Sequence, residues 1–118
     1  MMAELFRDQG TLTLKLTTGE KMEGVHGDIR VPIMSVQSVE ILDDVIHAVH
    51  GMRSPGTGIP GVLAIGTFRS SSETIFAVVH HQNKRGVKVR LTGEHFDAFI
   101  VGSDNPESLM ASLNLPEP

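Results

Sequence analysis

Short segments with the spacing and composition of β-strands recur along most of this chain, and they constrain its fold more than any other feature. Leu12, Leu14 and Leu16 alternate with threonine and lysine, which places the leucines on one face of an extended strand. Segment 86–91 alternates in the same way, and segment 74–79 is rich in apolar and β-branched residues. The pattern therefore predicts a mainly β protein.

Seven strands are predicted, and turn residues separate them at hairpin-length steps. They span 11–17, 21–26, 33–42, 62–68, 74–79, 86–91 and 96–101. The second strand follows a turn at Thr18-Gly19-Glu20 and has Met22 on its inner face. Pro32 makes the third strand irregular at its start.

Two helical segments are predicted. Residues 43–51 have an aspartate that can cap a helix of one or two turns and end at Gly51, a residue suited to a left-handed stop. In segment 105–114, Asn105 is the expected N-cap and Pro106 the first helical residue. The apolar stripe of that second helix consists of Leu109, Met110 and Leu113.

The 118 residues fit one domain, 1–118, with a lead-in at 1–10, the capping helix at 105–114 and a tail at 115–118. Antiparallel strands in hairpin-length steps, followed by one amphipathic helix, predict a seven-stranded barrel or orthogonal sandwich. The helix is expected to cover the open end.

Composition excludes several classes of function. The chain lacks cysteine, so it has no disulfide and no thiolate metal site, and its net charge of −4 provides no general attraction to nucleic acid. Tyrosine and tryptophan are absent, and no apolar run approaches the roughly 20 residues of a membrane-spanning helix. We expect a cytoplasmic protein without a cofactor and without a nucleic-acid partner.

The hexapeptide from Gly56 to Gly61, with Gly58 between them, reads G-x-G-x-x-G, the spelling of a dinucleotide-binding turn. A strand pattern follows it here, whereas the dinucleotide site requires a helix whose amides hold the pyrophosphate. We therefore predict a glycine-rich loop and no dinucleotide. The loop amides could still bind an anion together with Arg53 and Arg69, and Arg69 is expected to stand next to the loop.

Lys84, Arg85, Lys88 and Arg90 form the densest basic cluster. Lys88 and Arg90 share one face of their strand, opposite the apolar residues, and are expected to point into water. The cluster is interpreted either as a solubilising, edge-protecting face or as a patch for an acidic partner or a lipid head group.

The six histidines do not form a recognisable metal-ligand series, so no metal site is predicted. Asp44 beside His47, with the serines at 70–72, could be assembled into a small hydrolase, but nothing in the sequence fixes their geometry. No catalytic residue is predicted from these groups.

Several short stretches together resemble bacterial pleckstrin-homology-like domains of actinobacterial type, over about residues 29–113. They are Ile29-Arg30-Val31-Pro32, residues 53–61, Gly66-Thr67-Phe68-Arg69, Phe96-Asp97 and Asn105-Pro106-Glu107. The resemblance implies seven strands in two nearly orthogonal sheets, capped by the C-terminal helix. It implies little chemistry, because this superfold supports lipid, peptide and protein binding alike.

The lipid-binding members of that superfold carry paired basic residues on their first two strands. Here the region offers only Lys15 and Lys21, diluted by Glu20 and Glu23, so membrane contact is not supported. The leading hypothesis is a non-catalytic interaction module that binds a protein or forms a homo-oligomer. Two alternatives remain: anion or head-group binding at the 56–61 loop, and a small hydrolase that uses His47 and Asp44.

Overall fold

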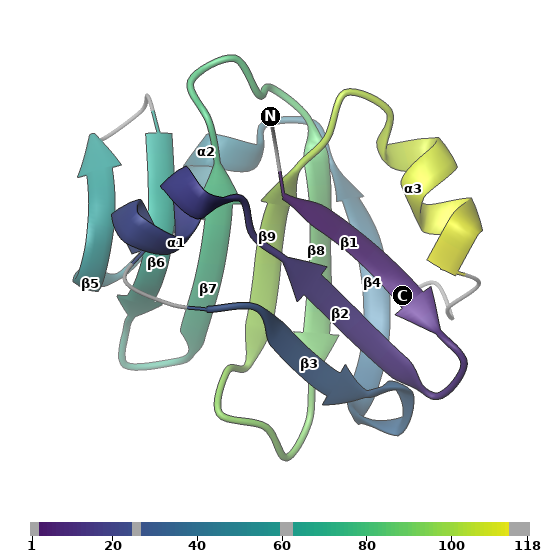
Figure 1. The fold of residues 1–118 in the computed structure, drawn as a ribbon. Coiled ribbons are helices and arrows are strands. Elements are labelled where there is room, and N and C mark those ends of the chain that lie inside the picture. Colours follow the sequence, from purple (N-terminus) through teal and green to yellow (C-terminus); the bar gives the residue numbers. More distant parts are fainter. Residues whose placement is uncertain (1–2, 25–26, 60–62, 114–118) are drawn as a thin grey trace.

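The protein is described here by a computed structural model that covers residues 3–24, 27–59 and 63–113 (Figure 1). Its strands are β1 (Glu4–Asp8), β2 (Thr11–Lys15), β3 (Ile29–Pro32), β4 (Val36–Leu42), β5 (Met52–Ile59), β6 (Leu63–Arg69), β7 (Thr74–Val79), β8 (Gly86–Leu91) and β9 (Ala98–Gly102). Its helices are α1 (Thr18–Gly24), α2 (Val45–Ala48) and α3 (Pro106–Leu113), with a 3-10 turn at Ile33–Ser35.

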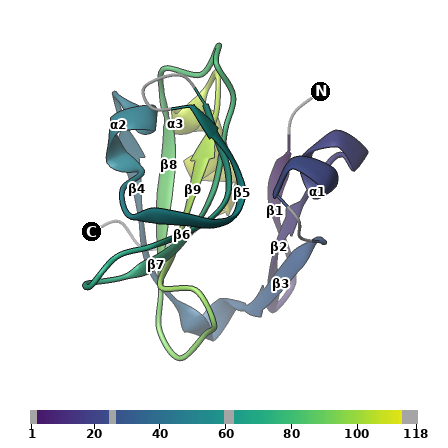
Figure 2. The ribbon, with the colours of Figure 1, turned by 90° about the vertical axis from the view of Figure 1, so that its left-hand side faces the viewer.

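The strands form two sheets that face each other as layers (Figure 2). The small sheet has the order β1-β2-β3, and the large sheet has the order β4-β8-β9-β7-β6-β5. Helix α1 lies on the side of the small sheet, whereas α2 lies on the opposite side of the large sheet. Helix α3 contacts both β1 and β4, and so spans the side where one edge of each sheet lies.

The main hydrophobic core fills the space between the sheets. Leu12 and Leu14 are fully buried there, as their alternation predicts, and they belong to the same cluster as Phe76 and Phe99 of the large sheet. A second cluster lies on the other face of the large sheet, where Ile75, Ala77 and Ile100 join Val45 of α2. Burial on both faces explains why β7 reads as an unbroken apolar run.

The prediction of a mainly β protein with a C-terminal helix is confirmed, and β7 and β8 have the predicted bounds. The structure is not a closed barrel, because β1, β3, β4 and β5 are edges of their sheets in the described part of the chain. The prediction that all strands pair antiparallel is wrong, since β7 and β9 pair in parallel. This pairing arises because β8 joins β9 as a hairpin neighbour, so β9 enters the sheet beside β7 in the same direction.

The turn predicted at 18–20 and the strand predicted at 21–26 are wrong, because α1 occupies this stretch up to Gly24. Thr17 and Glu20 form a capping box: the Glu20 amide donates to Thr17 Oγ1 at 3.2 Å, and Thr17 N donates to Glu20 Oε1 at 2.8 Å. Met22, expected to face the core, is 76% exposed. The T-x-x-E spacing of Thr17 and Glu20 was the sequence signal that could have predicted the start of this helix.

Other boundaries also shift. The predicted strand 33–42 is preceded by β3, and the 3-10 turn separates β3 from β4. The predicted helix at 43–51 is reduced to α2, because Val49 is already extended, and Gly51 with φ of 106° lies beyond the helix. Asp44 occupies the N-cap position without a capping hydrogen bond from its side chain. The lead-in predicted for 1–10 contains β1.

The C-terminal helix forms as predicted. Asn105 Oδ1 accepts a hydrogen bond from Ser108 N at 3.2 Å, and the helix begins at Pro106. Leu113 is fully buried, while Leu109 and Met110 are half-buried against the main core. Among the residues that the structure covers, no helix has the length and apolar character needed to cross a membrane.

Candidate functional site

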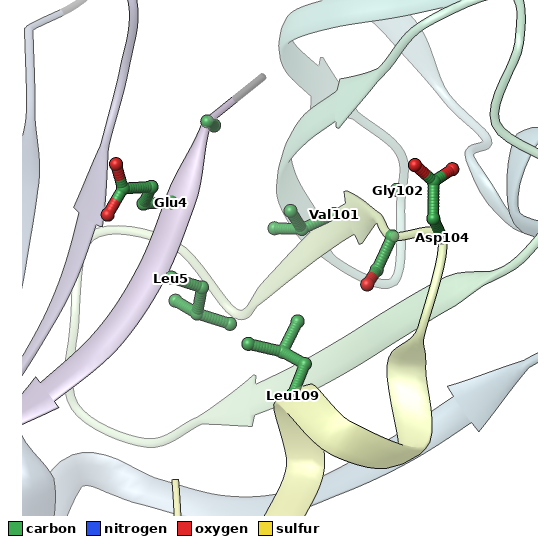
Figure 3. Close-up of a pocket in the computed structure, with 8 residues that line it drawn as sticks. Glu4, Leu5, Val101, Gly102, Asp104 and Leu109 are labelled. Carbon is green, nitrogen blue, oxygen red and sulfur yellow. The ribbon is translucent and has the colours of Figure 1, made fainter. Parts of the chain in front are cut away.

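A groove lies between β1, the end of β9 and α3, and we call it the β1–α3 groove (Figure 3). Its volume is about 290 Å³. One wall is an edge strand, because among the described residues β1 pairs with β2 alone. The groove is lined by Ala3, Glu4, Leu5, Val101, Gly102, Ser103, Asp104 and Leu109.

The floor of the groove is apolar. Leu5 occupies an inward-facing position of β1, Val101 lies near the end of β9, and Leu109 belongs to the apolar stripe of α3. Figure 3 shows these three side chains pointing toward one another from the three elements. Leu5 and Val101 are buried and Leu109 is half-buried, so the floor continues the main core outward to the surface.

Two carboxylates flank this floor. Glu4 lies on the other side of β1 from Leu5, as strand alternation requires, and Asp104 stands at the opposite wall, before α3 begins (Figure 3). Both side chains are exposed, and neither forms an ion pair with a described residue. The groove therefore combines an apolar floor, an acidic rim and a free strand edge.

Glu20 fixes the start of β1 beside the groove. Its side chain is 1% exposed, and Oε2 accepts hydrogen bonds from Ala3 N at 3.0 Å and from His80 Nε2 at 2.5 Å. Burial raises the pKa of Glu20, but the hydrogen bonds from His80, Thr17 and Ala3 outweigh it and hold the pKa below its ordinary value. The ionised carboxylate thus links α1, the start of β1 and the end of β7.

The basic cluster predicted from the sequence does not form a free patch. Arg85 makes a two-pronged ion pair with Glu107 and a further contact with Asp43 at 3.3 Å. Arg90 pairs with Glu40 at 3.2 Å. Lys84 is exposed and has no ion pair with a described residue.

The expectation that Lys88 points into water is wrong. Lys88 is 8% exposed, and its Nζ donates to Glu73 Oε1 at 3.1 Å. Glu73 Oε1 is also 2.8 Å from Nε2 of the partly exposed His50. Burial raises the pKa of Glu73, but the contacts with Lys88 and His50 more than compensate and lower it from its ordinary value. Lys88 lies inward because it forms an ion pair with this partly buried carboxylate.

The lowered pKa of Glu73 predicts how stability depends on pH. A carboxyl with a folded-state pKa below its ordinary value of 4.5 stabilises the fold above that value, and the stabilisation is lost as the pH falls through the folded-state pKa. In Lys88→Met, the folded-state pKa of Glu73 moves toward its ordinary value. We therefore expect the urea midpoint of this variant to change less between pH 6 and pH 3 than that of the wild type. Parallel curves for the two proteins would contradict the assignment.

The glycine-rich hexapeptide is not a loop throughout. Gly56 and Gly58 lie within β5 and pair with Gly66 and Ala64 of β6, while Gly61 lies outside the described residues. The sequence interpretation failed because two glycines in a strand look like a loop when the pairing strand is unknown.

The expected position of Arg69 next to the loop is also wrong. Arg69 pairs with Met52, whereas Ile59, the last described residue of the hexapeptide, pairs with Leu63 at the other end of β6. Leu63 and Arg69 are separated by the length of β6, about 20 Å at 3.3 Å per residue. The Arg53 backbone pairs with Phe68, and its side chain lies outside the described part of the structure. The anion hypothesis thus loses Arg69 as a charge near residues 60–62.

Of the residues in the hydrolase hypothesis, the structure brings His47 and Asp44 together, whereas Ser70 has other partners. His47 Nδ1 and Asp44 Oδ2 are 2.7 Å apart, and both side chains are exposed. Ser70 instead bonds to Ser72 and to the carbonyl of Glu73, and thereby closes the turn before β7. In the described ranges no group of three or more histidine, aspartate or glutamate residues has an arrangement suited to a metal ion.

A second cavity, of about 350 Å³, lies along β3, the opposite edge of the small sheet. Its two carboxylates already serve the fold: Asp28 Oδ1 accepts from Leu16 N at 2.8 Å, and Glu94 Oε2 accepts from the Ser35 hydroxyl at 2.6 Å. The hydrogen bond from Leu16 lowers the pKa of Asp28. Within residues 3–24, 27–59 and 63–113 the carboxylates of the β1–α3 groove have no such partners, which makes it the stronger candidate site.

The sequence pattern identified Leu109 as part of an apolar stripe but did not identify the groove. The groove joins the predicted lead-in to the last strand and helix, so its walls come from the two ends of the chain. Glu4, Leu5 and Phe6 do not alternate between polar and apolar residues, because the exposed position after Leu5 is occupied by Phe6, so the sequence offered no strand pattern for β1.

No protein-family model, curated protein or solved structure matches this chain. The pleckstrin-homology-like identity therefore remains a prediction, based on the short stretches quoted above.

Proposed function

We propose that this protein is a non-catalytic module that binds a protein partner, and that the β1–α3 groove takes an extended segment of that partner. The observation that carries the proposal is the free edge of β1 beside an apolar groove. An edge strand presents unpaired N–H and C=O groups to a neighbouring chain, and peptides bind proteins by adding a strand to such an edge.

The groove limits the length of the docked segment. Arg7 Nη1 donates to the Leu113 carbonyl at 3.4 Å, so α3 lies close to the second half of β1. From this end of the chain the groove is lined by Ala3, just before β1, and by Glu4 and Leu5 of β1. A partner segment would pair with this first half, and its alternate side chains would enter the apolar floor.

The use of the other polar groups supports a non-catalytic role. His80 is committed to Glu20, and His50 to Glu73, in pairs that join separate elements of the fold. The Asp44–His47 pair stands in solvent, and neither residue lines either of the two cavities described above.

Selection from a displayed library of random peptides tests the proposal. Leu109 and Met110 are adjacent, half-buried residues of α3, but only Leu109 lines the groove. We expect the selected peptides to bind the wild type and Met110→Asn alike, and to bind Leu109→Asn at least ten-fold more weakly, with circular dichroism showing that both variants fold. Equal binding to all three proteins, or no enrichment at all, would contradict the proposed function.

A further inference from the structure

We infer that the partner segment in the β1–α3 groove is basic, with lysine or arginine alternating with apolar residues. This inference rests on the proposed function and names the chemistry of the partner. Two observations carry it: the rim carboxylates form no ion pair with a residue that the structure describes, and the side chains of a paired strand must alternate between its two faces.

The rim charges are available for a ligand. Glu4 and Asp104 are exposed, and neither forms an ion pair with a described residue. Lys15 stands opposite Glu4 on β2, away from the free edge, and no ion pair joins the two side chains. Arg7, the cation on β1 itself, donates to the carbonyls of Gln9 and Leu113.

The pleat of β1 determines where each partner side chain points. In an added strand, side chains that share a face with Leu5 meet the floor formed with Val101 and Leu109. Side chains on the other face lie beside Glu4, which points away from that floor. An apolar residue therefore fits the inner face, and a cationic residue fits the outer face.

The opposite wall adds to this preference. Asp104 lies across the groove from β1, so acidic side chains stand at both walls of the groove. The net charge of −4 also favours the approach of a basic partner over an acidic one at low ionic strength. An acidic segment would instead place like charges together at the rim.

Two capped pentapeptides provide the test: one alternates lysine and valine, and the other alternates glutamate and valine. Binding is measured by titration of the isotope-labelled protein at low salt, followed by NMR. We expect the lysine peptide to bind at least ten-fold more tightly than the glutamate peptide, and its affinity to fall in 0.5 M salt because exposed charges are then screened.

Charge-reversal variants locate the interaction. Glu4→Lys and Asp104→Lys are each expected to weaken the lysine peptide about five-fold, since reversal replaces an attraction by a repulsion. Asp8→Lys makes the same change in net charge on the exposed face of β1 but outside the groove, and it is expected to have less than a two-fold effect.

The outcomes separate this inference from the proposed function. If both pentapeptides bind equally and Leu109→Asn weakens both, the groove binds segments but the charge preference is wrong. The charge preference is also wrong if the library peptides that bind the groove all lack basic residues. If neither pentapeptide binds and no library peptide binds the groove, both the inference and the proposed function are wrong.

Discussion

Replacement of Glu20 by alanine is expected to lower the free energy of unfolding by about 4 kcal/mol, because it removes a buried, ionised carboxylate that accepts three hydrogen bonds. The Glu20 carboxylate is 1% exposed and accepts hydrogen bonds from Ala3 N, Thr17 N and His80. Without it, these three partly buried donors lose their acceptor. Urea unfolding followed by circular dichroism measures the change.

Two further variants show whether the carboxylate itself is responsible. Glu20→Gln retains an amide oxygen that can accept one of these hydrogen bonds, so its loss should be smaller than that of the alanine variant. Glu4→Ala removes an exposed carboxylate from β1 and should change stability by less than about 0.5 kcal/mol. A loss below about 1 kcal/mol in Glu20→Ala would show that the buried carboxylate does not hold the start of β1.

Gly86→Ala is expected to destabilise the protein by about 3 kcal/mol, because the β8 and β9 backbones are too close there for a methyl group. Gly86 pairs with Gly102, and an added Cβ would lie 2.2 Å from the Val101 carbonyl oxygen and 2.9 Å from Gly102 Cα. Both atoms belong to the backbone, so no side-chain rotation relieves the overlap. The urea midpoint, or the loss of a cooperative transition, reports the effect.

Gly10→Ala is the matched control for this prediction. A Cβ at Gly10 meets no atom within 4 Å, and Gly10 does not have a positive φ. Its stability should therefore stay within about 0.5 kcal/mol of the wild type, or rise slightly because the unfolded chain loses freedom. If Gly86→Ala is as well tolerated as Gly10→Ala, the close approach of β8 to β9 is not present in solution.

Local patterns in the sequence predicted the elements whose own residues decide their structure. The leucines of β2, the apolar run of β7 and the alternation of β8 indicated strands correctly. The cap at Asn105 and the stripe ending at Leu113 indicated α3. In each case the burial pattern repeats with the period of the element itself.

The pairing of distant strands could not be obtained in this way. The parallel pairing of β7 with β9 depends on how β8 enters the sheet. The inward position of Lys88 depends on Glu73, which lies in the connection between β6 and β7. Neither relationship leaves a periodic trace in the sequence. The β1–α3 groove was missed for the same reason, because its walls come from opposite ends of the chain.

The central claim is that an extended segment binds along the first half of β1, between the strand edge and α3. Amide chemical-shift mapping with the lysine–valine pentapeptide tests it most directly, because each backbone N–H reports its own surroundings. We predict the largest shifts at Glu4 and Leu5, at residues 101–104 and at Leu109, and their loss in Leu109→Asn. Shifts centred on another face, for example along β3, would contradict the claim.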